Sequence, residues 1–292
     1  MSVNEEAIRA GLCELGLNDK DVAVHSSLKS FGRVTGGAHT VIRALLDVCG
    51  TVLMPTFCEI GRTNPPLEDR PPQNGWDYQG YRIDTDDTPP FDPDTFDETS
   101  ELNVGEMGHI PAEFLEADGT VRSKHPSVSW AANGPLAAWY ASGHGADDPN
   151  LPLKKLQQVQ GHVLLLGVGL EACTAIHLAE ETAGRRAFIR WIRYADGTIR
   201  RVREYGCSSG FPKLEPFVGA LASRVSIGKC QAVTYSVKRL VDAVVPAIVA
   251  QPELTLCGRK GVCRCQDSVK GGPIDNTRPT SACTVRWVIP GT

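Results

Sequence analysis

The stretch that decides the fold of this chain runs from Val22-Ala23-Val24-His25 through Gly36-Gly37 and residues 38–49 to Thr51-Val52-Leu53-Met54. The two short apolar runs are typical of buried strands, and the segment between them, which Gly50 closes, has the pattern of a helix. A strand, a helix and a second strand within about 35 residues predict a βαβ unit with parallel strands and a right-handed crossover. We therefore expect an α/β protein.

Further apolar patterns extend this prediction along the chain. The clearest is His162-Val163-Leu164-Leu165-Leu166, a continuous apolar run of the kind found in a strand buried on both faces. Thr174 can cap the helix that follows it, which runs to Ala183 with Gly184 just past its end. The other segments that we expect to be regular are helices over residues 5–17, 111–117, 136–142 and 236–249, two strands around Asp196-Gly197, and a last strand over residues 284–289.

The composition is that of an ordinary globular protein. The chain has 292 residues, of which 41% are hydrophobic and 22% charged, and its formal net charge is −4. No apolar run approaches the roughly 18 residues that a membrane span needs, and the acidic first residues lack the apolar core of a signal peptide. There is no basic stripe to bind nucleic acid. We expect a cytoplasmic monomer or homodimer with no nucleic-acid or membrane partner.

Residues 59–101 form a strongly acidic insertion. They contain twelve Asp and Glu and three Arg, a net charge of −9 that leaves +5 for the rest of the chain. Frequent proline and glycine predict a long irregular loop, and such loops are usually functional or disordered. Two interpretations remain open from the residues: a solvated surface loop, or an acidic rim that attracts a polycation.

The segment Arg122-Ser123-Lys124-His125-Pro126-Ser127-Val128-Ser129 places one histidine among two cations and three hydroxyls. Pro126 restricts the preceding residue to an extended conformation, so His125 has a defined geometry. Nearby cations favour the neutral imidazole, which is the usual proton acceptor at neutral pH. His125 is therefore a candidate general base, and the alternative is a loop histidine satisfied by neighbouring hydroxyls.

Two further groups follow predicted strands. Behind His25-Ser26-Ser27, the pair Gly36-Gly37 precedes a helix, and backbone N–H groups at a helix start can bind a phosphate. In the second group, His177 lies three residues before Glu180 and four before Glu181, so the three side chains share a helical face. Either glutamate can orient the His177 ring, and the alternative is an ordinary exposed pair. Because α/β sheets bind ligands at the carboxyl ends of their strands, we favour a functional role.

Together these motifs resemble those of the aminoglycoside 3-N-acetyltransferase family. They occur in the family's order and spacing across about residues 1 to 255. The segments that carry the resemblance are Val24-His25-Ser26-Ser27-Leu28, Gly32, Val34-Thr35-Gly36-Gly37-Ala38, Gly50-Thr51-Val52-Leu53-Met54-Pro55-Thr56, Phe91-Asp92-Pro93, Met107-Gly108, Arg122-Ser123-x-His125-Pro126-x-x-Ser129, Leu164-Leu165-Leu166-Gly167-Val168 and Cys173-Thr174-x-x-His177-x-Ala179-Glu180.

The resemblance implies a three-layer α/β/α fold with a mixed, partly parallel sheet, distinct from the common N-acetyltransferase fold. We expect one catalytic domain over residues 1–255, with the acidic insertion inside it, and a cysteine-bearing tail over residues 256–292 packed on the same domain. The implied reaction transfers an acetyl group from acetyl-CoA to the 3-amino group of an aminoglycoside by direct attack of the amine, which gives antibiotic resistance. Because the insertion is long and rich in proline, a non-antibiotic amine is the alternative acceptor.

The resemblance also implies residue roles. An ammonium group is not nucleophilic until it loses a proton, so the reaction needs a positioned base, and the matching motif assigns this role to His125. The other residues expected to be catalytic are Glu180 and Thr56. The residues expected to bind the cofactor are His25, Ser26, Ser27, Leu28, Gly36, Gly37, Ala38 and Ser123. The residues expected to bind the substrate are Asp92, His177, Glu180 and Glu181.

The ten cysteines raise two alternatives. Cys173 lies four residues before His177, a spacing that would suit a cysteine-dependent hydrolase. In the tail, the thiols of Cys257-x5-Cys263-x-Cys265 could bind zinc with Cys207 or Cys283 as the fourth ligand, which would make the chain a metal-binding or scaffold protein. The spacing is not C-x2-C and no histidine lies nearby, so we expect free thiols and no metal requirement.

Overall fold

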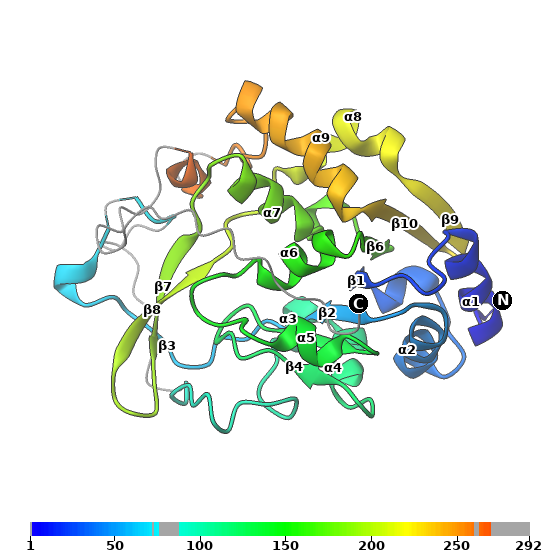
Figure 1. Ribbon diagram of the computed structural model, residues 1–292, viewed down its shortest axis with the longest axis horizontal. Helices are drawn as coiled ribbons and strands as arrows, with labels where there is room; N and C mark the ends of the chain where they lie inside the picture. The colour runs from blue at the N-terminus through cyan, green and yellow to red at the C-terminus, as the bar shows by residue number, and fades with distance from the viewer. Residues whose placement is uncertain (1, 72, 76–87, 260–262, 270–292) are drawn as a thin grey trace.

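The chain folds around a mixed seven-stranded sheet, which runs through the middle of Figure 1. The computed structural model describes residues 2–71, 73–75, 88–259 and 263–269. The strand order is β4-β5-β2-β1-β6-β10-β9, with β1 parallel to β2 and β6 and the other neighbours antiparallel. The strands are β1 (Val22–Ser26), β2 (Val52–Pro55), β4 (Val121–Arg122), β5 (Trp130–Asn133), β6 (His162–Leu166), β9 (Ser223–Ile227) and β10 (Cys230–Ser236).

Alternating side chains on the central strands face two helical layers. On β1, Val22 and Val24 pack into one apolar core and Ala23 into the other, and Leu164 and Leu165 of β6 divide in the same way. Strands buried on both faces need apolar residues at nearly every position, which explains their continuous apolar runs. One layer contains α1 (Glu5–Glu14), α2 (Gly37–Val48) and α4 (His109–Leu115), and the other contains α5 (Ala137–Ala141), α6 (Leu151–Gln158), α7 (Ala175–Thr182) and α9 (Val237–Ala250). The predicted three-layer α/β/α class is confirmed.

Most of the predicted elements are present. The parallel pairing of β1 and β2 confirms the βαβ unit, and β6, α4, α5 and α9 match their predictions to about two residues. The first helix ends at Glu14, before the predicted end, because Gly16 has a φ of 74°, which a right-handed helix does not include. The strand predicted over residues 284–289 lies outside the described residues. Within the described ranges, none of the helices has the length and apolar character that a membrane span requires.

A second, three-stranded sheet takes up part of the insertion that was predicted to be irregular. β3 (Arg62–Thr63) pairs with β7 (Phe188–Arg193), which pairs with β8 (Ile199–Glu204), and the β7–β8 hairpin lies on the left of Figure 1 with its tip toward the bottom. This hairpin confirms the two strands predicted around Asp196-Gly197. Phe91 and Phe96 of the insertion pack with Tyr194 in a small apolar cluster. Parts of the insertion are therefore built into the fold.

Three charged side chains, one from each strand, join this small sheet. Glu204 at the end of β8 forms ion pairs with Arg62 of β3 (2.6 Å from Nη1 to Oε1) and with Arg190 of β7 (3.8 Å from Nε to Oε2). All three side chains are buried. Burial alone would raise the pKa of Glu204, but the two guanidinium groups outweigh it and hold this pKa below its usual value. The ionised carboxylate therefore stabilises the folded state.

Glu204→Gln removes this buried charge and with it the ion pairs to Arg62 and Arg190. We expect the free energy of unfolding at pH 7, measured by urea denaturation, to fall by about 3–5 kcal/mol. The matched control is Glu215→Gln, which breaks the exposed pair with Arg224 (3.0 Å) and should cost less than about 1 kcal/mol. Equal losses in the two variants would contradict the structural role of Glu204.

The same pair of variants gives a pH dependence. Because the folded-state pKa of Glu204 is lowered, its contribution is fully present above the unfolded pKa of about 4.3 and is lost as the pH falls through the folded value. The stability gap between the wild type and Glu204→Gln should therefore shrink below about pH 4, and a gap that stays constant would argue against this titration.

Candidate active site

Two cavities meet at His177. The first, here the carboxylate cavity, is open to solvent, spans about 750 Å³ with that open part included, and is lined by Asp147, Asp148, Asn150, His177, Glu180, Glu181, Arg185, Tyr205, Cys207, Thr255 and Cys265, among others. The second, here the sheet-edge cavity, is also open to solvent, spans about 1130 Å³ on the same measure, and is lined by Val24, His25, Ser26, Pro55, Phe57, Val128, Val168, Thr174, His177, Glu204, Tyr205 and Phe211, among others. The sheet-edge cavity lies at the carboxyl ends of β1, β2 and β6, the usual place for a ligand in an α/β sheet.

The His177 ring is fixed by three contacts. It stands in the first turn of α7, and its Nδ1–H donates a hydrogen bond to Glu180 Oε2 over 2.8 Å. Tyr205 stacks on the ring with centroids 4.8 Å and planes 8° apart, and Phe211 meets the ring edge-on at 4.8 Å. The contact with Glu180 selects the tautomer whose lone pair is on Nε2. No hydrogen bond from the described residues reaches Nε2, so a proton acceptor lies where the two cavities meet.

Glu180 is held in its ionised form by a buried network. Burial would raise its pKa, but the hydrogen bond and charge of His177, the guanidinium of Arg185 and the hydroxyl of Thr255 lower this pKa below the usual value. Arg185 Nη1 and Thr255 Oγ1 each donate to Glu180 Oε1 over 2.5 Å. The predicted contact between His177 and a glutamate at helical spacing is confirmed, with Glu180 as the partner.

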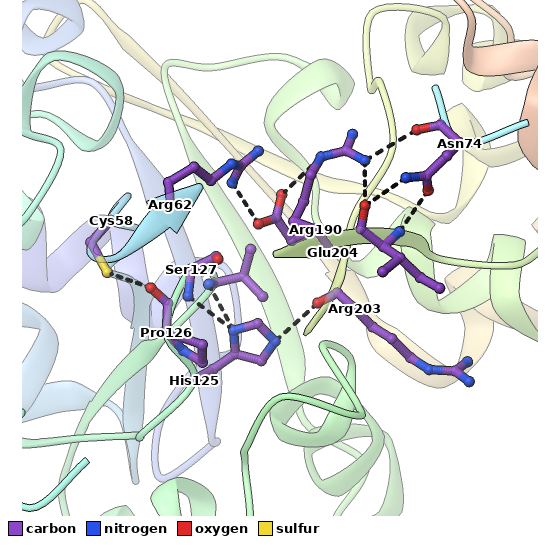
Figure 2. A network of polar contacts seen from close by, with 11 residues as sticks. Cys58, Arg62, Asn74, His125, Pro126, Ser127, Arg190, Arg203 and Glu204 are labelled. Carbon is purple, nitrogen blue, oxygen red and sulfur yellow. Dashed lines mark hydrogen bonds and ion pairs between the residues drawn. The ribbon is translucent and has the colours of Figure 1, made fainter. Parts of the chain in front are cut away.

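His125 lies in the polar network that Figure 2 shows; it lines neither cavity itself, although its partner Arg203 lines the carboxylate cavity and its partner Val128 lines the sheet-edge cavity. Its ring is fully buried: Nδ1 accepts hydrogen bonds from the backbone N–H groups of Ser127 (3.2 Å) and Val128 (3.0 Å), and Nε2–H donates to the Arg203 carbonyl over 3.0 Å. Burial also lowers the pKa of His125 to about 4. Neither ring nitrogen is left to take a proton from a substrate. The predicted role of general base therefore does not fit His125, which holds the turn after Pro126 against the end of β8.

Two other residues of the predicted site are also enclosed. Thr56 is completely buried, and its carbonyl accepts a hydrogen bond from the guanidinium of Arg122 over 2.8 Å. Ser123 is 1% exposed, and its hydroxyl is 2.7 Å from Nδ1 of His144. Neither residue lines a cavity, so the catalytic role of Thr56 and the cofactor-binding role of Ser123 stay predictions without support from the cavity geometry.

The predicted cofactor-binding residues divide into two groups. His25 and Ser26 line the sheet-edge cavity, and the buried atoms His25 Nε2 and Ser26 Oγ have no hydrogen-bond partner among the described residues. Buried polar atoms without a partner are rare in native structures, so both are candidates for contact with a ligand. Burial lowers the pKa of His25 to about 3, which keeps its ring neutral. The residues that line neither cavity are Ser27, Leu28, Gly36, Gly37 and Ala38, and their contact with a cofactor stays a prediction.

Carboxylates from two segments line the carboxylate cavity. Glu180 and Glu181 were predicted from the sequence, whereas Asp147 and Asp148, in the loop before α6, were missed. Their only signal was an Asp-Asp-Pro-Asn turn sequence, which also suits an ordinary loop. Lys154 Nζ bridges Asp148 and Glu181 at 2.8 Å from each.

The acidic insertion contributes little to these cavities. Asp92 lines neither of them, and its Oδ1 accepts a hydrogen bond from the Asp94 N–H over 3.0 Å. No described residue of the range 59–101 lines the carboxylate cavity. The carboxylates available to a cationic ligand at this cavity therefore come from α7 and the loop before α6. Asp92 as a substrate-binding residue stays a prediction without support from the cavity geometry.

The alternative of a cysteine-dependent hydrolase does not fit the geometry of Cys173. Its side chain is fully buried, it lines neither cavity, and burial raises its pKa to about 12. A reactive cysteine needs an accessible thiolate, which these surroundings disfavour.

Comparison with known proteins shows the family to which this chain belongs. Residues 23–248 match the family described as aminoglycoside 3-N-acetyltransferase, and the chain belongs to this family. It is 35% identical over 197 residues to aminoglycoside N(3)-acetyltransferase IX of Micromonospora chalcea, covering 63% of this chain and 64% of that protein. It is 36% identical over 189 residues to aminoglycoside N(3)-acetyltransferase VII of Streptomyces paromomycinus, covering 62% and 61%. The chain thus spans slightly less than two thirds of the length of these relatives.

Solved structures of related proteins have the same fold. The aminoglycoside acetyltransferase AAC(3)-Xa superposes with a TM-score of 0.67 at 29% identity, covering 87% of this chain and 94% of that one. AAC-IIIb, in a binary complex with CoASH, superposes with a TM-score of 0.68 at 24% identity, covering 86% and 98%.

The contacts of His125 predict that its replacement costs stability. His125→Ala removes the three hydrogen bonds of the buried ring, to the Ser127 and Val128 N–H groups and the Arg203 carbonyl, so the free energy of unfolding should fall by about 2–4 kcal/mol in urea denaturation. Replacing the exposed His39 by Ala is the control and should change it by about 0.5 kcal/mol or less. A His125→Ala variant as stable as the wild type but without acetyl transfer would restore His125 as the base.

Proposed function

We propose that this chain transfers an acetyl group from acetyl-CoA to the 3-amino group of an aminoglycoside, with His177 as the general base. The observation that carries the proposal is the position of His177, whose Nδ1 is held by Glu180 at the junction of two cavities. Membership of the family supports the reaction. Acetylation converts a cationic amine of the drug to a neutral amide, which would give resistance. A cytoplasmic location belongs to the same proposal, because acetyl-CoA is available there.

The sheet-edge cavity suits the acetyl donor. Pro55, Phe57 and Val168 give it apolar walls for the acetyl group and the thioester-bearing arm of CoA. The unpartnered Ser26 hydroxyl is a candidate donor to the oxygen that becomes negative when the thioester is attacked. AAC-IIIb, which has the same fold, was solved with CoASH, and this supports acetyl-CoA as the donor.

The carboxylate cavity suits the acceptor. Aminoglycosides carry several ammonium groups, and carboxylates bind such groups through charge-assisted hydrogen bonds. Asp147, Asp148 and Glu181 lie on its walls, and Lys154 already bridges two of them. Ammonium groups of the substrate would join this network. An acceptor here would present an amine to His177 from the side opposite the donor.

The mechanism follows from the two ring nitrogens of His177: Nδ1 is held by Glu180, and Nε2 faces the junction of the cavities. The neutral imidazole takes a proton from the attacking amine at Nε2, while the amine nitrogen forms a bond to the acetyl carbon and the bond from that carbon to sulfur breaks. Glu180 stabilises the imidazolium that forms. His177 then returns its proton to the departing CoA thiolate, so the enzyme ends as it began. No covalent acetyl-enzyme is needed, in agreement with the burial of Cys173.

The first experiment measures CoA thiol release from acetyl-CoA with gentamicin, sisomicin, tobramycin, kanamycin, neomycin or apramycin as the acceptor. We expect acceptor-dependent release and a product with one added acetyl group, which NMR should place on the 3-amino group. If the protein binds CoA but none of these drugs is acetylated, the acceptor is a non-antibiotic amine and the aminoglycoside assignment is wrong. Failure to bind CoA would overturn the proposal as a whole.

His177→Gln tests the base. Glutamine can keep a hydrogen bond to Glu180 but cannot take a proton, so kcat should fall about 10²–10⁴-fold while the unfolding curve stays close to that of the wild type. His39→Gln, on an exposed helical position, should retain full activity. A His177→Gln enzyme with wild-type kcat would exclude His177 as the base.

The double change Asp147→Asn with Asp148→Asn tests the acceptor site. Loss of charged hydrogen-bond partners should raise KM for the aminoglycoside by about tenfold or more, with KM for acetyl-CoA unchanged. Glu14→Gln, a neutralised carboxylate at the exposed end of α1, controls for the overall change in charge. An unaltered KM for every accepted drug would place the acceptor elsewhere.

A further inference from the structure

We propose that Cys207, Cys257, Cys263 and Cys265 together bind one zinc ion, which fastens the C-terminal segment to the chain that leaves β8. The site lies beside the carboxylate cavity, which Cys207 and Cys265 line. It is independent of the proposed acetyl transfer, since it rests on the arrangement of the four thiols alone.

The four sulfur atoms have the spacing of a metal centre. All of them lie within 4.8 Å of one another, and Sγ of Cys257 and Sγ of Cys265 are 3.6 Å apart. In a tetrahedral zinc site with Zn–S bonds of about 2.3 Å, the sulfurs lie about 3.8 Å from each other. Small shifts of side chains therefore bring all four into a tetrahedron. Four thiolates fill the coordination shell of zinc, which is the pattern of a structural site and not of a catalytic one.

The fourth ligand comes from a distant part of the sequence. Cys257, Cys263 and Cys265 follow α9, whereas Cys207 lies three residues beyond Glu204, the last residue of β8. The sequence left Cys207 and Cys283 as equal candidates for this position, and the folded chain brings Cys207 to the other three thiols. Cys283 lies outside the described residues. The expectation of free thiols rested on spacing along the chain, which does not show this convergence.

The backbone around Cys257 supports the site. Gly258 has a φ of 75°, which turns the chain sharply after Cys257. The Arg259 N–H then donates to Sγ of Cys257 over 3.4 Å, and the N–H of Cys263 donates to the Arg259 carbonyl over 3.0 Å. Hydrogen bonds of this kind orient ligand atoms around a metal. The Arg259 side chain also interacts with Cys257 and Cys207, where it offsets the negative charge that four thiolates bring.

A disulfide explains less of the arrangement. Joining Cys257 to Cys265 would use two sulfurs 3.6 Å apart but would leave the thiols of Cys207 and Cys263 beside them without a role. Zinc accounts for all four. An S₄ tetrahedron also selects zinc or iron over the hard cations, which prefer oxygen ligands.

The site would fix one wall of the carboxylate cavity. Thr255, two residues before Cys257, donates a hydrogen bond to Glu180, the partner of His177. A zinc ion would therefore hold this segment from one side while Glu180 holds it from the other.

The test is the metal content of the full-length chain, expressed with zinc in the medium, purified under reducing conditions and measured by plasma mass spectrometry. We expect about one zinc per chain in the wild type and a loss of about tenfold in Cys257→Ser and in Cys263→Ser. The matched controls are Cys13→Ser, at an exposed position on α1, and Cys283→Ser, and both should keep the zinc. Loss of zinc from Cys283→Ser would overturn the ligand set.

A second measurement does not depend on variants that fold. Removal of zinc from the wild type with a chelator and a reductant should lower the melting temperature by more than about 5 °C and expose four additional thiols to a colorimetric reagent. Cobalt(II) added to the zinc-free protein should give the intense visible absorption of a tetrahedral thiolate site. Zinc below about one tenth per chain in the purified wild type, iron in its place, or a Cys257–Cys265 disulfide found by peptide mass mapping would each overturn the proposal.

Discussion

The ionised carboxylate of Glu204, buried between two arginines, is the interaction on which the rest of the site depends. This carboxylate fixes the end of β8, and neighbouring residues of the chain then contact three parts of the structure. The Arg203 carbonyl accepts the hydrogen bond from His125, Tyr205 stacks on His177, and Cys207 reaches the thiols that follow α9. A single well-anchored strand end thus positions a buried turn, the proposed base and the proposed metal site. The energetic reason is that a buried carboxylate with one partner removed is strongly destabilising, so the three strands that contribute the charges hold together as a unit.

Two histidines in this chain show how hydrogen bonding decides what an imidazole can do. His125 accepts two backbone N–H groups and donates to a carbonyl, so its bonding capacity is used up inside the protein. His177 uses Nδ1 for the hydrogen bond to Glu180, and its Nε2 stays open to a ligand. Tyr205 and Phe211 hold the ring in place without forming hydrogen bonds to it. The difference lies in the contacts and not in the ring itself.

The sequence predicted the sheet and its two helical layers well but the candidate site only in part, because buried strands have a local apolar pattern and most site residues do not. Continuous apolar runs such as residues 162–166 identify buried strands directly, and a helical spacing of three connected His177 to a glutamate. The cations and hydroxyls around His125 suggested chemistry, but Arg122 and Ser129 donate hydrogen bonds to the Thr56 carbonyl, and the Ser123 hydroxyl accepts one from the Trp130 N–H. These groups therefore satisfy buried backbone atoms. Strand β3 was missed because only two residues of the acidic insertion pair with β7. Asp147 lies in a turn sequence that also suits an ordinary loop, and Cys207 was one of two candidates for a fourth thiol, because the place of both residues arises from contacts with segments far away in the chain.

The β7–β8 hairpin has a consequence for how this chain can change in evolution. Successive side chains of β8 point to opposite faces of the small sheet, and Glu204 is buried whereas Arg203 is only partly buried. A slip of one residue against β7 would exchange the faces to which these two side chains point. The register is set at the exposed tip, where Gly197 has a φ of 80° and Asp196 accepts hydrogen bonds from the backbone and hydroxyl of Thr198. Surface tips usually tolerate insertions and deletions freely. The residues of this tip line neither cavity, yet a residue added or deleted there that shifts the register would turn Glu204 away from its two arginines.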